Sequence, residues 1–468
     1  FGSSDVAASP SVRARAPEAR AAPFGNAMRA VVLRLLLGVV AVGEVGAADD
    51  DVVASLPGYG SPKTRHFAGY SDATPDGANK LFYYFVEADI GSGSPETPFL
   101  IWLNGGPGAS SLIGLLSENL GPQQITENAT LAENPHRLTK KYHLMAVDNP
   151  VGAGFAYTTT GGYVKTELEM RTQFVYALRG FYAKHPEYKN NPLWITGESY
   201  GGKYVPNIAY EIATNAKEMP LQGIVVGNGM YNERIAYTTV GEVAMGEGVI
   251  SEKLLQEVEV REQQCLAAIE QQMPKAGDFC ENITVRWLYE GPNAAAGELF
   301  YYDFGIVDPT ELDRISKSLG SYLNRADVKA ALHAQSSTWQ NADETGPVAE
   351  ALAPDFVVPS ITVVEAFLEL GKEVLLYNGV RDGSVCNHIG NLKTVLAMHW
   401  SGAEAFAASV NEPWPSRQQV MGHIRGAKNL RFATVMRSGH LVPKVQPESF
   451  ATLAAMAFDR PAVPALVV

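Results

Sequence analysis

The run TGESYGG, residues 196–202, combines the residue types of a nucleophile site. Ser199 lies between Gly197 and Gly201 and fits the pattern G-x-S-x-G. The apolar run LWIT precedes it and the helical text GKYVPNIAYEI follows it, which is the strand–turn–helix context that lifts a serine toward solvent. We therefore predict that Ser199 is a nucleophile. Glu198, directly before it, would repel an anionic substrate if it were ionised, so the chemistry has to account for it.

A serine nucleophile needs a base, and the base needs an acid that orients it. A serine in this context is followed along the chain first by the acid and then by the histidine. Asp382 follows the strand-like EVLLYNGVR, and His440 follows the strand-like LRFATV near the C-terminus. Asp148 also ends strand-like text but precedes the serine, so the predicted triad is Ser199, Asp382 and His440. Other histidines after the acid lack the strand–Gly–His context: His388, His399 and His423.

The charge that develops on a substrate carbonyl needs backbone N–H donors. The loop NGGPG, residues 104–108, follows the apolar PFLIWL, where such a loop belongs in a hydrolase sheet. We predict that the N–H groups of Gly106 and Tyr200 form the oxyanion hole. A plain glycine turn is the alternative interpretation of this loop.

The elements that position these residues can be read from short apolar runs, each ending in a glycine-rich or polar turn. Such runs predict buried strands at residues 98–106, 143–150, 193–202, 223–229, 373–379 and 430–440. Helical text lies between them, as in residues 166–185 and 204–218. Alternating strands and helices predict a mostly parallel sheet with helices on both faces, with the site at the C-terminal ends of the strands.

The pattern changes over residues 231–330, where acidic and Gln-rich helical text replaces the strand signals. We predict an inserted helical cap here, with the first part of the core at residues 48–230 and the second at 331–468. The sheet is expected to resume near residues 324–334 and at 373–379. A separate domain is the alternative for the inserted segment.

The amino-acid composition limits the classes of protein to which this chain can belong. The chain has 468 residues, 46% hydrophobic and 19% charged, which suits a globular fold with a sizeable core. Its net charge of −13 comes without a Lys/Arg-rich cluster, so nucleic acid is not an expected partner. After residue 47 no apolar stretch reaches the ~18 residues of a membrane-spanning helix.

The first 47 residues differ from the rest. Residues 1–27 are rich in Ala, Pro, Ser and Arg and are interpreted as an unstructured or untranslated extension. Residues 28–47 have a basic start, an apolar stretch and small residues before a cut, which predicts a signal peptide. N-glycosylation sequons at Asn128 and Asn282 also fit a protein that enters the secretory pathway. We expect a protein of the secretory pathway with no membrane partner after signal removal.

The three cysteines are Cys265, Cys280 and Cys386. The first two bracket a helical and loop stretch, and a local disulfide between them is compatible with the sequence. Cys386 would then be the odd thiol. It lies four residues after Asp382, so we predict that it lines the substrate pocket and that a bulky mercurial on it blocks substrate binding.

With these residues placed, the sequence resembles the serine carboxypeptidase family, the acid vacuolar and lysosomal enzymes of the α/β-hydrolase fold. The motifs that carry the resemblance run in the family's order: SLPGY (55–59), WLNGGPGASS, TGESYGGKYVP, YNGVRDGSVCNHIGN, and GHLVP with VPKVQPE (442–448). One departure is Ala109, which stands where the family usually has a cysteine bonded to the cap region.

The resemblance implies a peptide or protein C-terminus as the substrate and no metal or organic cofactor. It also implies a set of residues that binds the substrate carboxylate: Asn104, Gly105, Glu118 and Glu198. Two carboxyls that share one site cannot both ionise easily, so one would stay protonated and donate to the substrate. The alternatives are an acyltransferase of the same fold and a non-catalytic, binding or chaperone-like relative. The sequence does not define an oligomeric state.

Overall fold

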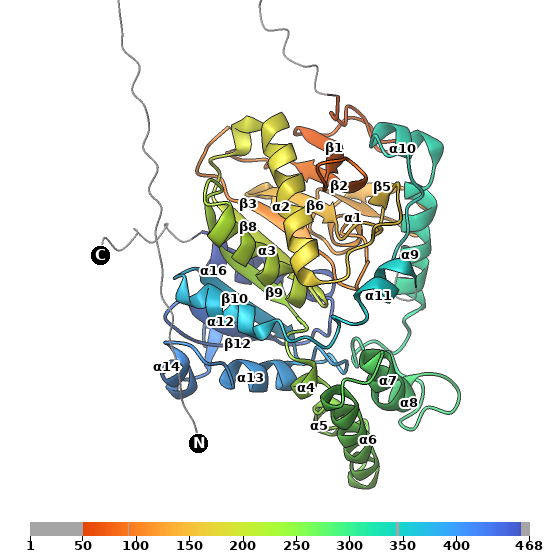
Figure 1. Cartoon of the computed structure of the whole chain (residues 1–468), viewed down its shortest axis with the longest axis vertical. Helices are drawn as coiled ribbons and strands as arrows, with labels where there is room; N and C mark the ends of the chain where they lie inside the picture. The colour runs from red at the N-terminus through yellow and green to blue at the C-terminus, as the bar shows by residue number, and fades with distance from the viewer. Residues whose placement is uncertain (1–49, 92, 343–345, 460–468) are drawn as a thin grey trace, which may run out of the picture. The chain divides into compact units, whose positions relative to one another are not determined.

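The structure is a computed structural model that describes residues 50–91, 93–342 and 346–459 (Figure 1). The predicted extension, residues 1–27, and the predicted signal peptide, residues 28–47, lie outside the described residues. Within the described residues no helix is both long and apolar enough to cross a membrane.

A large mixed sheet forms the centre of the fold. Its strands run in the order β1-β2-β6-β3-β8-β9-β10-β13-β12-β11, with β7 paired to β2. The six strands from β6 to β13 in this order are parallel, and the strands at both edges are antiparallel. The strand bounds are β1 His66–Asp72, β2 Asn79–Val86, β3 Phe99–Leu103, β6 His143–Asp148, β7 Tyr157–Thr158, β8 Leu193–Glu198, β9 Leu221–Gly227, β10 Glu373–Gly379, β11 Glu412–Pro415, β12 Val420–Ala427 and β13 Leu430–Val435.

The six strands predicted from apolar runs are the six parallel strands, so the predicted fold class is confirmed. The antiparallel edge strands β1, β2, β11 and β12 were not predicted from the sequence. Strand β12 has only intermediate or exposed residues apart from Gly422, so it lacks the continuous apolar run that marks a buried parallel strand. A small second sheet pairs β4 Gln123–Ile125 with β5 Leu131–Glu133.

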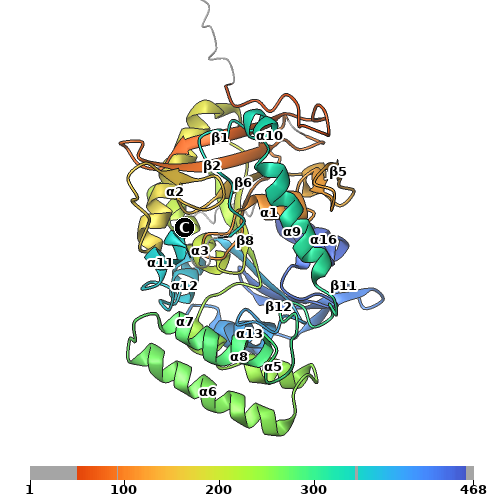
Figure 2. The ribbon, with the colours of Figure 1, turned by 90° about the vertical axis from the view of Figure 1, so that its right-hand side faces the viewer.

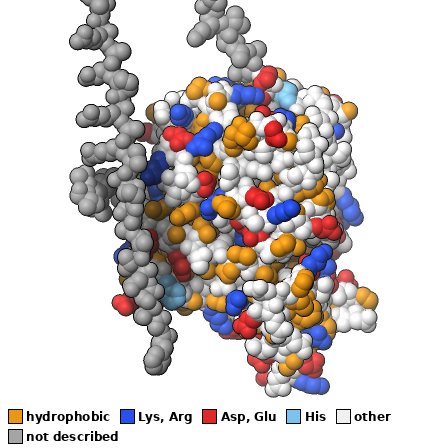
Figure 3. All heavy atoms as spheres, in the orientation of Figure 1, with side chains coloured by type: hydrophobic (Ala, Val, Ile, Leu, Met, Phe, Trp, Pro, Cys, Tyr) orange, Lys and Arg blue, Asp and Glu red, His pale blue; other side chains and the backbone are white. Residues whose placement is uncertain are grey.

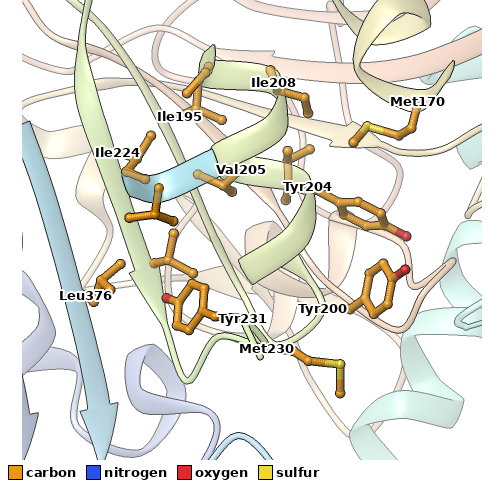
Figure 4. Close-up of a cluster of buried hydrophobic side chains, with 14 of the residues drawn as sticks. Met170, Ile195, Tyr200, Tyr204, Val205, Ile208, Ile224, Met230, Tyr231 and Leu376 are labelled. Carbon is orange, nitrogen blue, oxygen red and sulfur yellow. The ribbon is translucent and has the colours of Figure 1, made fainter. Parts of the chain in front are cut away.

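Helices cover both faces of the sheet because alternate side chains of each parallel strand point to opposite sides. In β3, Phe99, Ile101 and Leu103 join one apolar layer, and Leu100 and Trp102 join the other. The first layer packs under α2 Glu167–Lys184, α3 Gly201–Asn215 and α12 Ile361–Glu369, and the second under α1 Leu112–Ser117 and α16 Pro447–Phe458. Figure 4 shows Tyr204, Val205 and Ile208 of α3 within the first layer.

A long helical segment separates β9 from β10. It contains α4 Glu233–Ala236, α5 Val240–Gly246, α6 Glu252–Glu270, α7 Ala276–Glu281, a π-helical turn Asn282–Arg286, α8 Trp287–Tyr289, α9 Thr310–Leu323, α10 Ala326–Ala331, α11 Pro347–Leu352 and α12. Helices α5 to α8 group at one end of the molecule (Figure 2). Helix α9 instead packs against α1 and β4 of the core.

The prediction that the sheet resumes near residues 324–334 was wrong. This stretch forms α10 and a turn, and the sheet resumes only at β10. Its apolar residues Val328 and Leu332 are four apart, so they share one helix face, and both are buried. The remaining helices are α13 His388–Leu396, α14 Ala403–Ala408 and α15 Val442–Val445, with short 3₁₀ turns at Leu138–Lys140 and Pro186–Tyr188. On the face shown in Figure 3, acidic and basic side chains are interspersed.

Candidate active site

Ser199 lies on a tight turn between β8 and α3. Its φ angle is 60°, a left-handed conformation that is rare for a residue with a side chain and is common at functional sites. The Ser199 N–H donates to the carbonyl groups of Gly227 and Asn228, at 3.1 Å each. These bonds tie the turn to the end of the neighbouring strand β9, so the position of Ser199 is fixed by the sheet.

The Asn-Gly-Gly loop after β3 lies directly against this turn. A side chain at Gly105 would overlap the backbone nitrogen of Tyr200 and crowd the Cβ of Ser199, so only glycine fits. Gly106 has a φ angle of 105°, which also favours glycine. The loop and the start of α3 therefore meet where the sequence predicts the oxyanion hole, with the partial positive charge of the helix N-terminus beside it.

Asp382 and His440 come together at the ends of β10 and β13. The Nδ1 atom of His440 lies 2.7 Å from Oδ2 of Asp382, and the two side chains are almost fully buried. A carboxylate at Nδ1 fixes the tautomer that carries its proton there, which leaves Nε2 free to accept a proton. The other carboxylate oxygen of Asp382 accepts the N–H of Ser384 at 2.9 Å.

Asn228 is a residue of the candidate site that was not predicted from the sequence. Its backbone carbonyl receives the Ser199 N–H, and its side-chain amide donates to Oδ2 of Asp382 at 2.7 Å. Its side-chain oxygen accepts the N–H of Gly379 at 3.0 Å. Asn228 therefore joins the nucleophile turn to the acid. The only signal in the sequence was its place in the polar turn that ends the apolar run at residues 223–229.

Asn104 holds Glu198 and Glu118 in one buried cluster. The Asn104 oxygen accepts the Trp102 indole N–H at 2.9 Å and the Gly114 N–H at 3.0 Å. These donors orient the amide, so its NH₂ group faces the carboxyls, at 2.9 Å from Glu198 and 3.4 Å from Glu118. The resemblance to the serine carboxypeptidases predicted this grouping across residues far apart in the chain.

The electrostatics of this cluster favour one shared proton. Burial, together with the charge of Glu118 and a hydrogen bond to it, raises the pKa of Glu198 well above its ordinary value. Burial also raises the pKa of Glu118, but the hydrogen bond from Glu198 and the charge of Lys444 oppose that effect. Glu198 therefore keeps the proton of the pair.

Cys386 is the free thiol of the chain, whereas Cys265 and Cys280 form a disulfide between α6 and α7, a pairing that the sequence left open. The Cys386 side chain is 3% exposed, and burial raises the pKa of its thiol well above the ordinary value. Its backbone carbonyl accepts the Asn378 amide at 2.7 Å. The thiol is thus covered and its protonated form is favoured, so we expect a mercurial to reach it only after local opening.

The two predicted glycosylation sites differ in their surroundings. Asn128 is exposed in the turn between β4 and β5, where a glycan would point into solvent. Asn282 is also exposed, but it lies in the helical turn after α7. The hydroxyl of Thr284, the third sequon residue, is buried and donates to the carbonyl of Cys280 at 2.7 Å.

A mostly parallel sheet with a serine on a strand–helix turn, followed by an Asp–His pair at the ends of later strands, defines the α/β-hydrolase class. The family model described as serine carboxypeptidase matches residues 57–459. The chain therefore belongs to the serine carboxypeptidase family.

Individual proteins that are similar to this chain are named as carboxypeptidases. The pheromone-processing carboxypeptidase kex1 of Aspergillus niger is 30% identical over 426 residues, which are 85% of this chain and 68% of the relative. Serine carboxypeptidase-like 48 of Arabidopsis thaliana is 29% identical, over 83% of this chain and 78% of the relative. The chain spans about two thirds of the length of several fungal relatives. The crystal structure of Kex1Δp, a prohormone-processing carboxypeptidase from Saccharomyces cerevisiae, has a TM-score of 0.74 at 22% identity, covering 85% of this chain and 91% of that chain, which shows the shared fold.

Proposed function

We propose that this protein removes single residues from the C-termini of peptides and proteins at acid pH, through an acyl-enzyme on Ser199. In this proposal Ser199 attacks the last peptide carbonyl and Nε2 of His440 takes its proton. Asp382 holds the imidazole by Nδ1, and the N–H groups of Gly106 and Tyr200 stabilise the oxyanion. His440 then protonates the departing amino acid, and water releases the acyl group from the serine.

The observation that carries the exopeptidase proposal is the buried Glu198–Glu118 cluster beside the nucleophile. A protonated Glu198 can donate a hydrogen bond to the free carboxylate of a substrate, and the Asn104 amide and the Gly105 N–H are further donors at the same place. An endopeptidase or an esterase has no substrate carboxylate to bind here. For such an enzyme, two buried carboxyls would be a cost without a purpose.

The proposed setting of the enzyme follows from the remaining features. We propose that residues 231–330 form a cap beside the site and that the core is made of residues 48–230 and 331–468. The Cys265–Cys280 disulfide supports folding in an oxidising compartment, which agrees with the predicted secretory route. Vacuole, lysosome and extracellular space are all compatible with it.

The direct test is hydrolysis of a blocked dipeptide at pH 4.5 to 5.5, with the products identified by mass. We expect release of one free C-terminal amino acid, covalent labelling of Ser199 by a fluorophosphonate, and loss of both in Ser199→Ala. Two competing functions would appear as other outcomes. Transfer of the acyl group to an added alcohol in preference to water would identify an acyltransferase, and a folded protein without labelling would identify a non-catalytic relative.

A further inference from the structure

Residues 301–305 form a short non-helical segment between α8 and α9 that crosses the loops carrying Asp382 and His440. We call this segment the strap. It belongs to the helical segment between β9 and β10, and it is far in sequence from both loops. Its role in the site was not predicted from the sequence, because the text YYDFG carries no recognised pattern.

The strap forms backbone hydrogen bonds on both sides of Asp382. On one side of Asp382, the Phe304 N–H donates to the Arg381 carbonyl at 3.1 Å. On the other side, the Gly383 N–H donates to the Tyr301 carbonyl at 2.7 Å. These two bonds resemble the pairing of two strands, so the strap fixes the backbone immediately before and after the carboxylate that orients the imidazole.

The strap also holds the base. The backbone N–H of His440 donates to the Tyr302 carbonyl at 2.6 Å, and the Tyr302 ring meets the imidazole edge-on, with ring centres 5.0 Å apart. The N–H of Gly439, the residue before the histidine, donates to Oδ2 of Asp303 at 2.8 Å. The backbone N–H groups of Gly439 and His440 therefore both donate hydrogen bonds to the strap.

Asp303 is the strap residue whose side chain binds the loop that carries His440. It is 2% exposed, and its second oxygen accepts the N–H of Gly305 at 2.8 Å, so both carboxylate oxygens have backbone donors. Burial raises the pKa of Asp303, and the two backbone N–H donors and the charge of Arg381 oppose that effect.

The packing leaves little freedom between the strap and the two loops. A side chain on Gly439 would overlap the Tyr302 carbonyl and press on Asp303. A side chain on Gly383 would overlap the ring of Phe304. The residues next to His440 and Asp382 thus have to be glycine because the strap lies against them, which is an observation independent of the hydrogen bonds.

We propose that Asp303, through the strap, is a positioning residue that sets the imidazole of His440 relative to Asp382 and Ser199. This inference rests on the catalytic roles proposed above for those three residues. The inserted segment, residues 231–330, would then have two roles. It would cover the site, and it would support the loops that carry Asp382 and His440. Misplacing a catalytic group by about 1 Å can cost about a hundredfold in rate.

The test compares Asp303→Ala and Asp303→Asn with a matched control, Asp51→Ala. Asp51 is equally buried at 2% exposure, and its carboxylate contacts Tyr83 and His185 at the edge of the sheet near β1. We would measure kcat and KM for a blocked dipeptide, and the second-order rate of Ser199 labelling by a fluorophosphonate. Labelling run to completion counts the competent sites, so a loss of folded protein is separated from a loss of rate.

For Asp303→Ala we expect kcat and the labelling rate to fall together by about tenfold to a hundredfold, with KM within about twofold of wild type. Asp303→Asn keeps one acceptor oxygen and should recover much of the rate. Asp51→Ala should lower stability but leave kcat per competent site unchanged. An Asp303→Ala enzyme with wild-type kcat per site, or a loss that the asparagine does not reduce, overturns the inference. His440→Ala is included because activity in that variant would instead refute the proposed triad.

Discussion

Glu198 and Glu118 face one another in a buried cluster, with exposures of 2% and 1%, and the amide of Asn104 donates to both. The acid beside the nucleophile is therefore not an isolated negative charge. We propose that it shares a proton with a second carboxyl and that this proton is available to a substrate carboxylate. This relationship connects the position of Glu198 in the sequence to the proposed exopeptidase activity.

Replacing Asn104 by Asp should affect substrates with a free C-terminus selectively. The substitution removes the NH₂ donor and adds a third acid, so a bound carboxylate loses a hydrogen bond worth about 1.5–3 kcal/mol. We expect kcat/KM for a blocked dipeptide to fall at least tenfold. The C-terminal amide of the same dipeptide is the control, and an equal fall for both substrates would mean that Asn104 only supports the loop.

Replacing Asn228 by Ala should disturb the position of Asp382. Asp382 loses the donor at 2.7 Å, and the Gly379 N–H loses its acceptor. A hydrogen bond to a charged group contributes about 1.5–3 kcal/mol, so we expect kcat to fall about tenfold to a hundredfold with KM nearly unchanged. Steady-state kinetics at the pH optimum would measure it. A wild-type kcat in a folded variant would exclude Asn228 from the positioning of Asp382.

How much of this site the sequence predicts depends on how local each signal is. Ser199 and the glycine-rich loop were predictable because turn, strand and helix signals are neighbours in the chain. Asn228 and Asp303 were not, because their partners Asp382 and Gly439 lie 154 and 136 residues away. Glu118 sits at the end of a short helix with no local signal, and only the resemblance to a family pointed to it.

Stability should depend on pH through Glu167 at the start of α2. Burial raises the pKa of this carboxyl to about 8, and the neighbouring Asp355 and Glu233 act in the same direction against the charge of Lys203. Because the folded-state pKa lies above the ordinary 4.5, this contribution to stability is complete below about pH 4.5 and is lost as the pH rises through about 8.

The variant Glu167→Gln cannot lose a proton. We expect it to match wild type at pH 4.5 and to be more stable at pH 8, by about 4 kcal/mol in the free energy of unfolding. Urea unfolding at the two pH values would measure it. Glu257→Gln, at an exposed position of α6, is the control and should show no such difference. A stability gap between wild type and Glu167→Gln that is the same at both pH values would contradict the pKa assignment.

Cys386 should react with a mercurial slowly in the folded protein and quickly in denaturant, because its thiol is buried and its pKa is raised. Once labelled, the enzyme should lose dipeptide hydrolysis in proportion to the label, since the added bulk lies four residues from Asp382. The labelled fraction and the residual activity can be followed in parallel, with Cys386→Ser as the unreactive control. Full activity after stoichiometric labelling would remove Cys386 from the substrate pocket.

The most direct measurement of the central claim is kcat/KM against pH for a blocked dipeptide and for its C-terminal amide. For the dipeptide we expect strong activity at acid pH and a decline as the proton shared by Glu198 and Glu118 is lost, because the ionised pair repels the substrate carboxylate. The amide carries no such charge, so its activity should persist above the pH at which the dipeptide fails. In Glu118→Gln the pKa of Glu198 loses the raising effect of its neighbour, so the dipeptide decline should move to lower pH. Parallel profiles for the two substrates in wild type would contradict the claim that Glu198 recognises the C-terminal carboxylate.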